Sequence, residues 1–466
     1  MPSPSPSTTP RALVADETRR ILALAWPVML TSLNWTILHV TDVIVVGLVG
    51  TGEVAALGAS RSLTFVAIVA GLAGLSGVLV FTARADGAGD LKRTGGVLRE
   101  GLALALLLGL AIGLLLFVFA APMLAAMGVA DALLPQAARV VLVMGISFPF
   151  QLVIVAASYF LEGVSRPRRV MTVNLSILPL NALLAWALSG GHLGLPALGA
   201  VGAATATAIA SLVGAAGMLG AVWTLPRARL RGVHDFSPAA WAAMPIGIAR
   251  LAQFGVVPAI ASGLELAGFS ILIALSTRLG DAAAHAFQIV FSIHNVTFGV
   301  ALGLGSAAGV RAGNAVGEGT PAAAVPRTLI AVGVAALFTG LLAVLLVIGR
   351  AGVVGLFPAT SEVNALALAM VPLWAPFILF DGAQVVLVYA LRSLGDQVAA
   401  GINSIIAYFL VTGGAGWWLI HAGFGLPGLV YASGAGMVAA AALHGGRFAL
   451  VSYRFRLKSS APCSSN

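Results

Sequence analysis

Long apolar runs of about 20 residues recur from one end of this chain to the other, and they constrain the fold more than any other feature. A helix of that length crosses the roughly 30 Å hydrocarbon core of a bilayer. Because no water reaches backbone groups there, each run must satisfy its own hydrogen bonds as a helix. Only 9% of the residues are charged, whereas soluble domains carry about 25%. We therefore expect an all-α integral membrane protein.

Hydropathy and loop residues together predict twelve transmembrane helices. They lie near residues 21–48, 55–82, 99–122, 137–160, 170–190, 197–224, 253–276, 283–310, 327–349, 366–391, 399–420 and 427–450. The longest polar break, PRARLRGVHDFSPAAW at 226–241, separates two groups of six. The predicted organisation is a disordered cytoplasmic tail (1–20), an amino-terminal lobe (21–224), a cytoplasmic linker (225–252), a carboxy-terminal lobe (253–450) and a cytoplasmic tail (451–466).

The basic residues predict the orientation of the chain. All but four of the 25 Lys and Arg residues fall on the side of the two termini, and the four exceptions are Arg61, Arg139, Arg278 and Arg350. The positive-inside rule then places both termini and the linker in the cytoplasm of a multi-pass plasma membrane protein, which in bacteria means the inner membrane. The net charge of +9 is thus explained by basic residues that orient the chain in the membrane, and no nucleic-acid partner is expected. The one cysteine, Cys463, lies in a polar tail, so no disulfide framework is expected.

The two halves of the sequence resemble each other at an offset of about 228 residues. Four pairs of segments match in the same order: RADGAGD (84–90) with RAGNAVGE (311–318), TGEVAALGAS (51–60) with LGDAAAHAFQ (279–288), YFLEGVSRP (159–167) with YALRSLGDQ (389–397), and GLPALGAVGAATA (194–206) with GLPGLVYASGAGM (425–437). Six spans per copy give both copies one orientation. We expect two pseudo-symmetric six-helix lobes around a central cavity, an arrangement typical of alternating access.

Three carboxylates lie well inside predicted spans: Asp42, Glu265 and Asp381. An Asp at the centre of a membrane helix costs about 2.5 to 3.5 kcal/mol on insertion scales. One interpretation is that each acid is structural and pairs with a neighbouring donor. We favour function, because the sequence pattern places no Lys or Arg deep in a span to neutralise these acids. Burial disfavours the ionised form of a carboxyl group, so each could exchange a proton, or bind Na⁺ where several oxygens gather.

Uncharged and weakly basic residues of the spans complete the predicted sites. Asn181 in the fifth span could add an oxygen ligand near Asp42, and His39 shares a helix face with Asp42. The predicted cation-coupling residues are Asp42, Glu265, Asp381 and Asn181, with Na⁺ possible at Glu265 and Asp381 or at Asp42. The predicted lining of the substrate cavity is Asp381, Gln288, Gln384 and His39. His294 in the eighth span is interpreted as a packing or hydrogen-bonding residue.

Several chemistries have no motif in this sequence. It contains no phosphate-cradling Gly-rich loop with Lys, no His/Cys cluster with metal-ligand spacing and no nucleophile elbow. We therefore expect neither an enzyme nor a cofactor. Uphill transport would draw on an ion gradient, since one H⁺ or Na⁺ crossing the membrane potential releases about 2.3 kcal/mol per 100 mV.

The combination of motifs resembles the multidrug and toxic compound extrusion (MATE) family. LAWPVMLTSLNWTILHVTDVIVVGLVGTGEVAALG resembles its first helix, with Pro27, Asp42 and Gly47 at the family's positions. Similar matches are LEGVSRPRRVM (161–171), LELAGFSILIALSTRLGDAAAHAFQ (264–288), AAGVRAGNAVGEG (307–319) and DGAQVVLVYALRSLGD (381–396). The resemblance extends over residues of about 20 to 450. The family often places an Asn four residues before the position of Asn181, and Ile177 stands there instead.

The resemblance implies a secondary active antiporter that exports organic cations, amphipathic drugs or metabolites in exchange for H⁺ or Na⁺. Asp42 then matches the acid of the amino-terminal lobe, and Glu265 and Asp381 match the two acids of the carboxy-terminal lobe in the bacterial multidrug branch. We expect a monomer whose partners are the lipid bilayer and small, cationic or amphipathic substrates. One alternative is a lipid-linked oligosaccharide flippase, which would favour a cavity rich in Arg and Lys. Another is an integral membrane enzyme, which would favour acids at the interface.

Overall fold

The computed structural model of the protein describes residues 10–235 and 237–460. Every regular element in these two ranges is a helix, and twelve helical segments are long and apolar enough to cross a membrane, which confirms the predicted fold class. The α-helices are α1 (Pro10–Gly47), α2 (Thr51–Gly74), α3 (Ser76–Gly87), α4 (Leu91–Ala126), α5 (Leu134–Gly163), α6 (Pro167–Gly190), α7 (Gly199–Trp223), α8 (Pro238–Thr277), α9 (Asp281–Gly317), α10 (Ala324–Val354), α11 (Ser361–Trp374), α12 (Ile378–Ser393), α13 (Gln397–Ser404), α14 (Gly413–His421) and α15 (Gly425–Ser460). Three further segments are the 3₁₀ turns η1 (Pro321–Ala323) and η2 (Ala375–Phe377) and the π-helix η3 (Ile405–Thr412).

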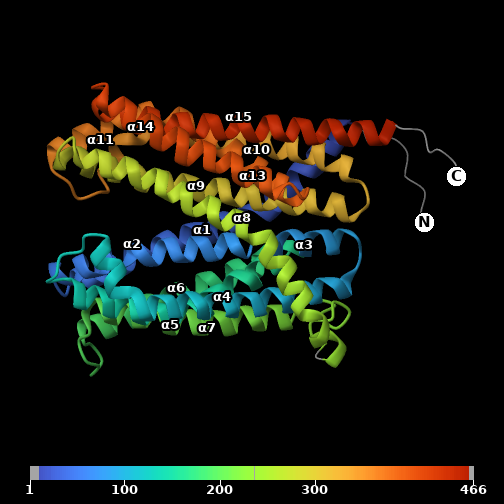
Figure 1. Cartoon of the computed structure of the whole chain (residues 1–466), viewed down its shortest axis with the longest axis horizontal. Helices are drawn as coiled ribbons and strands as arrows, with labels where there is room; N and C mark the ends of the chain where they lie inside the picture. The colour runs from blue at the N-terminus through green and yellow to red at the C-terminus, as the bar shows by residue number, and fades with distance from the viewer. Residues whose placement is uncertain (1–9, 236, 461–466) are drawn as a thin grey trace. The chain divides into compact units, whose positions relative to one another are not determined.

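The chain divides into two compact units (Figure 1). Within the described residues, unit 1 comprises 10–29, 87–89 and 264–460, and unit 2 comprises 30–86 and 90–263. Helices α1 and α8, which open the two sequence repeats, each contribute residues to both units. The lobes predicted from the sequence, 21–224 and 253–450, instead place the predicted spans of these two helices, 21–48 and 253–276, each within one lobe. The predicted cavity between the lobes remains a prediction.

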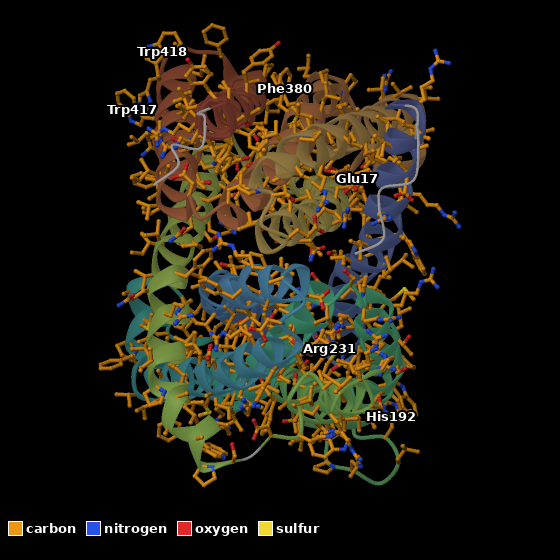
Figure 2. The ribbon with its side chains drawn as sticks, turned by 90° about the vertical axis from the view of Figure 1, so that its right-hand side faces the viewer. Glu17, His192, Arg231, Phe380, Trp417 and Trp418 are labelled. Atoms are coloured by element: carbon orange, nitrogen blue, oxygen red, sulfur yellow. The ribbon has the colours of Figure 1, made fainter. Side chains whose placement is uncertain are left out.

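Each unit has its own apolar core. In unit 2 the core centres on α5, where Phe148, Leu152 and Phe160 are fully buried against α2, α4 and α7. In unit 1 it gathers Phe269 of α8 and Trp374 of α11. Many large apolar residues face outward, including Trp417 and Trp418 of α14, which are 57% and 60% exposed (Figure 2). Apolar surfaces of this extent are expected where lipid is the solvent.

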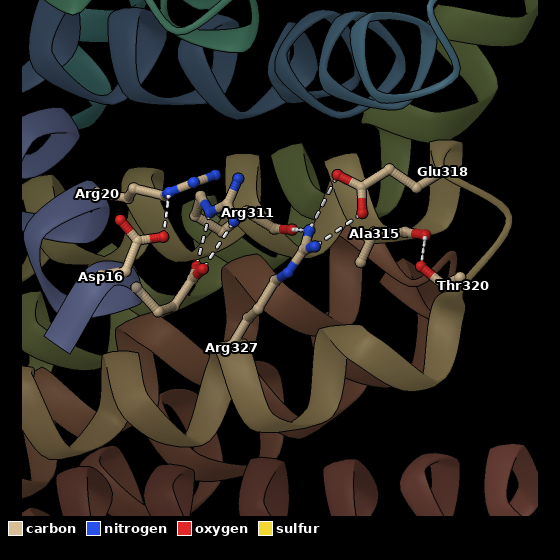
Figure 3. Close-up of polar contacts among 8 residues, drawn as sticks. Asp16, Arg20, Arg311, Ala315, Glu318, Thr320 and Arg327 are labelled. Carbon is tan, nitrogen blue, oxygen red and sulfur yellow. Dashed lines mark hydrogen bonds and ion pairs between the residues drawn. The ribbon is translucent and has the colours of Figure 1, made fainter. Parts of the chain in front are cut away.

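Helix α1 begins earlier than the sequence analysis predicts. Residues 10–20, expected to belong to a disordered tail, are helical, while residues 1–9 lie outside the described ranges. A Pro at the first position of a helix loses no hydrogen bond, and two ion pairs hold the following turns. Asp16 contacts Arg20 at 2.9 Å along the helix, and Glu17 receives two hydrogen bonds from Arg311 of α9 at 2.6 and 2.7 Å (Figure 3). Contact with α9 therefore orders a segment that was expected to be disordered because of its polar composition.

The start of α8 also has a local explanation. Ser237 precedes Pro238, and its hydroxyl accepts a hydrogen bond from the amide of Ala240 at 3.3 Å. A Ser cap followed by Pro is the pattern typical of a helix amino terminus. Hydrogen bonds from the Ser237 hydroxyl and amide lower the pKa of the Asp235 carboxyl. The linker thus ends at Ser237, and residues 238–252, expected to belong to the linker, are the first part of the continuous helix α8.

The amino terminus of α7 is capped by a side chain from another helix. Its own capping position, Leu198, offers no side-chain hydrogen bond. Instead Glu53, in the first turn of α2, accepts a hydrogen bond from the amide of Ala200 at 2.6 Å and another from Gln136 of α5. Glu53 therefore ties three helices of unit 2 together, and it satisfies amide groups that a helix start leaves unpaired.

Two spans of unit 1 are interrupted. In the tenth span, α11 gives way to η2 and then α12, because Pro376 has no N–H to donate and its ring clashes with the preceding turn. In the eleventh span, η3 separates α13 from α14, and the hydroxyl of Thr412 donates to the carbonyl of Ala407 across this π-helical stretch. Such irregular segments inside membrane helices are rare and often occur at functional sites.

Candidate functional site

Asp381 is the most deeply buried of the three predicted acids, with 2% of its surface exposed. It lies in the first turn of α12, directly after the η2 interruption. Helical backbone continues from η2 into α12, and the amide of Ile378 donates to the carbonyl of Ala375. The irregular turn thus lies about one turn before the acid.

Three side chains from three helices contact the Asp381 carboxylate. The imidazole Nε2 of His294 on α9 lies 3.3 Å from Oδ2. Gln384, one turn further along α12, donates from Nε2 to Oδ1 at 3.1 Å. The hydroxyl of Tyr408, presented by the π-helix η3, donates to the same Oδ1 at 3.4 Å. The buried charge is therefore surrounded by hydrogen-bond donors, as a buried carboxylate requires.

His294 sits in an aromatic environment. Its ring centroid lies 5.4 Å from that of Trp374, 5.6 Å from that of Phe269 and 5.9 Å from that of Phe291. The residue is 7% exposed, and its Nδ1 atom is buried without a hydrogen-bond partner among the described residues. A narrow hollow beside it is lined by Phe287, Val290, Phe291, His294, Trp374, Val430 and Ser433. Apolar rings thus fix the imidazole while only one of its nitrogens is engaged.

Glu265 lies on α8 in the same unit and is half-buried. Its charge interacts with that of Asp381, and no described residue donates a hydrogen bond to it. Three residues further along α8, Gly268 packs against the backbone of η3, and a Cβ added there would lie 2.1 Å from the carbonyl oxygen of Tyr408. The glycine allows α8 and η3 to approach closely, and that approach keeps Tyr408 beside Asp381.

A second polar site lies in unit 2 around Asp42, which is 4% exposed. Asn181 of α6 donates from Nδ2 to Oδ1 at 2.9 Å, so the two residues are in contact, while the expected oxygen ligand from Asn181 remains a prediction. Arg61 of α2 donates to Oδ2 at 3.2 Å and also to the backbone carbonyl of His39 at 3.2 Å. The expectation that no span holds a basic residue to neutralise these acids is therefore wrong for Asp42. The sequence analysis placed Arg61 near the start of the span 55–82, but α2 begins at Thr51, so Arg61 lies ten residues inside the helix.

Two amide oxygens in unit 2 have no hydrogen-bond partner in the described part of the chain, one on Asn181 beside Asp42 and one on Asn34, eight residues earlier on α1. The Oδ1 atoms of Asn181 and Asn34 are buried and accept no hydrogen bond from the described residues. Asn34 donates to the backbone carbonyl of Asn174 at 3.0 Å. Ile177, which stands where the related family often has Asn, is 8% exposed and contributes no oxygen. Asn34 and Asn174 together place polar atoms near the position where that Asn is missing.

Comparison with known proteins assigns the chain to a family. The MatE family profile matches residues 27–187 and 258–415, which is more than half of the chain. The chain belongs to the MatE family. The "Probable multidrug resistance protein NorM" of Caulobacter vibrioides is 34% identical over 428 residues, covering 90% of this chain and 89% of that protein. The protein of the same name from Burkholderia pseudomallei is 31% identical over 445 residues, covering 94% and 92%.

A solved structure shares the fold of this chain. A MATE-family multidrug resistance transporter of the MOP superfamily, solved in an outward-facing conformation, superimposes with a TM-score of 0.84 at 20% identity, covering 97% of this chain and all of that one. These relatives are named as resistance proteins or transporters, so this MatE-family chain is a multi-pass membrane transporter and not an enzyme.

The predicted site residues of this MatE-family chain have different surroundings. Gln384 contacts Asp381, whereas Gln288 is exposed on α9. His39 is half-buried with its ring edge-on to Trp35, 6.5 Å between centroids. Whether these residues line a substrate cavity remains a prediction.

Three contacts of this MatE-family chain escaped the sequence analysis. His294 was interpreted as a packing or hydrogen-bonding residue, and what the sequence did not indicate is that its partner is Asp381. Tyr408 was not considered, because one Tyr in an apolar span has no distinguishing pattern. Arg61 could have been recognised from the sequence as a basic residue inside a span, since it follows the start of α2 by ten residues. All three meet their acids across helices that are far apart in sequence, and spacing within one helix cannot reveal such contacts.

Proposed function

We propose that this MatE-family chain is a proton-coupled antiporter of the bacterial inner membrane that extrudes organic cations and amphipathic drugs. Its relatives in Caulobacter vibrioides and Burkholderia pseudomallei are named multidrug resistance proteins, which supports the substrate class. Twelve apolar spans with deep acids supply an environment in which cations are attracted by charge. The basic loops support a topology with both termini in the cytoplasm.

The contact between His294 and Asp381 is the observation that favours H⁺ over Na⁺ as the coupling ion. Na⁺ takes several oxygen ligands with free lone pairs. Around Asp381, two of the three contacting atoms are nitrogens, His294 Nε2 and Gln384 Nε2, and the third is a hydroxyl that already donates. Such a shell suits a proton held between an imidazole and a carboxylate better than it suits a metal ion, because His is the side chain that gains and loses a proton near neutral pH.

The exchange itself follows from charge balance. Asp381 and Glu265 interact electrostatically within a mostly apolar part of unit 1. Two negative charges there are costly unless a cation compensates them. In the proposed cycle, that cation is a proton when the site is loaded from one side of the membrane and an organic cation when it is loaded from the other. Each cation displaces the other, so the downhill flow of protons drives extrusion.

Asp42 serves a different role in this proposal. Its carboxylate already contacts the guanidinium of Arg61 at 3.2 Å, and that fixed positive charge competes with Na⁺ for the same oxygens. We assign Asp42, Asn181 and Arg61 to a polar cluster that holds α1, α2 and α6 together. Because the half-buried Arg61 is paired with an acid, it supplies no free charge for the pyrophosphate of a lipid-linked oligosaccharide, and the flippase alternative is not favoured.

Efflux of a cationic dye from proteoliposomes tests the coupling ion. Wild-type protein should extrude dye when a pH gradient is imposed and should not respond to a Na⁺ gradient at fixed pH. Asp381→Asn should abolish the response. The matched control Asp281→Asn makes the same change at an exposed position of α9 and should retain it. A response to Na⁺ alone would refute proton coupling.

The role of His294 is tested separately from that of the acid. His294→Gln preserves a hydrogen-bonding side chain but cannot take up a proton, so we expect dye binding to persist while pH-driven efflux falls to the level of empty liposomes. The control is His285→Gln, at an exposed position of the same helix. Normal pH-driven efflux by His294→Gln would show that the imidazole takes no part in coupling, whatever the role of Asp381.

A further inference from the structure

A basic hollow in unit 2 is distant in sequence from both acid sites. It has a volume of about 280 Å³ and is lined by Val164, Arg166, Leu225, Pro226, Arg227 and Arg231. Its base is apolar, since Val164 and Leu225 are 3% and 5% exposed. Three guanidinium groups from two separate segments, the α5–α6 turn and the loop after α7, therefore surround one small depression.

The charges around this hollow are not balanced. Arg231, which lies among the helices of unit 2 in Figure 2, pairs with Asp86 at 2.7 Å and is held in place by that contact. Arg166 and Arg227 are exposed, and neither is hydrogen-bonded to another side chain in residues 10–235 and 237–460. Two unneutralised guanidinium groups beside a third, positioned one form a site for an anion with several oxygens.

Backbone groups add to the attraction. Arg166 occupies the capping position of α6, and no side chain caps that helix. The dipole of α6 favours an anion at this end of the helix. Only three described residues other than glycine have a positive φ, and two of them adjoin the hollow, Ser165 at 60° and Arg227 at 62°. Strained backbone of this kind often occurs where side chains are held for binding.

We propose that this hollow binds a phosphate group. Arginine forks match the geometry of phosphate oxygens, and the apolar base accommodates the carbon substituent of a phosphate ester. The phosphate could belong to an acidic phospholipid headgroup or to a soluble phosphate compound. Trp223 and Leu230, which are 51% and 65% exposed beside the same loop, are residue types found at membrane interfaces. The proposal is independent of the coupling mechanism.

Binding is measured on the purified full-length protein. One arm titrates nanodiscs that contain phosphatidylglycerol in a phosphatidylcholine background and counts the lipids retained by native mass spectrometry. The other arm titrates inorganic phosphate and a water-soluble phosphate monoester in detergent. Saturable retention of phosphatidylglycerol identifies the membrane as the source, and saturable binding of the soluble phosphates identifies a solute. Either outcome supports the proposal, provided that the arginine variants weaken the binding.

Two double variants distinguish binding at the hollow from a general effect of the positive charge of the protein. Arg166→Gln/Arg227→Gln should weaken phosphate binding roughly tenfold or more, because charge-assisted hydrogen bonds are lost. Arg229→Gln/Arg250→Gln removes the same charge at exposed positions outside the hollow and should leave affinity unchanged. Equal affinity in the two double variants would overturn the proposal.

A single variant guards against a folding artefact. Arg227→Gly removes one guanidinium and places glycine where φ is 62°, a conformation that glycine adopts without strain. We therefore expect a melting temperature at least equal to that of wild type together with weaker phosphate binding. An unchanged affinity in this well-folded variant would contradict the assignment of the hollow.

Discussion

The ion pair between Glu17 and Arg311 allows a quantitative test of what orders the amino-terminal turns of α1. Glu17 Oε1 and Oε2 accept from Arg311 Nε and Nη2 at 2.6 and 2.7 Å (Figure 3). The two side chains are only 11% and 10% exposed. Removing one partner of a buried pair costs about 3–5 kcal/mol, because the remaining charge is left without compensation. Arg311 also interacts with Glu318 and Asp16, so we take about 3 kcal/mol for this site.

The assay is thermal unfolding of the detergent-solubilised protein, followed by tryptophan fluorescence. A domain of about 150–250 residues loses roughly 2–4 °C of Tm per kcal/mol, so Glu17→Met and Arg311→Met should each melt roughly 6–12 °C below wild type. The double variant should recover most of that loss, because two apolar side chains replace the pair without leaving a charge. Asp16→Asn is the control, since its pair with Arg20 is 59% and 57% exposed and contributes less than about 1 kcal/mol.

The reasoning is refuted if the double variant loses as much stability as the two single variants added together. That result would mean that Glu17 and Arg311 act independently and that their bidentate contact does not hold α1 on α9. A double variant as stable as wild type, beside two unstable single variants, supports the calculation.

Two further substitutions test the packing of each unit. Gly268→Ala should destabilise unit 1 by about 1–3 kcal/mol and reduce transport, because its Cβ would lie 2.1 Å from the carbonyl oxygen of Tyr408. Gly263→Ala on the same helix meets no atom within 4 Å and should be neutral in both thermal unfolding and dye efflux. Glu53→Ala should lower the stability of unit 2 by about 1–3 kcal/mol in the same unfolding assay, because it leaves the amide of Ala200 without its acceptor. A Tm unchanged in Glu53→Ala would show that water satisfies this amide.

Much of the architecture was predictable from residue order alone. Apolar length decides which segments cross the membrane, and backbone hydrogen bonding then requires that they be helices, so all twelve predicted spans are confirmed. Asp42, Glu265 and Asp381 stand out for the same reason, since an acid in a long apolar run is conspicuous in a linear sequence. Motif order was sufficient to indicate the family that comparison then confirmed.

The tertiary structure alone decided what each acid contacts. Asp42 meets Arg61 and Asp381 meets His294 because separate helices pack together, and the residues of the second pair are 87 positions apart. The same holds for α1, where contact with Arg311 orders turns that look like a polar tail. Hydropathy is a property of one segment read by itself. A hydrogen bond or ion pair between helices depends on the register and rotation of both, and only packing determines these.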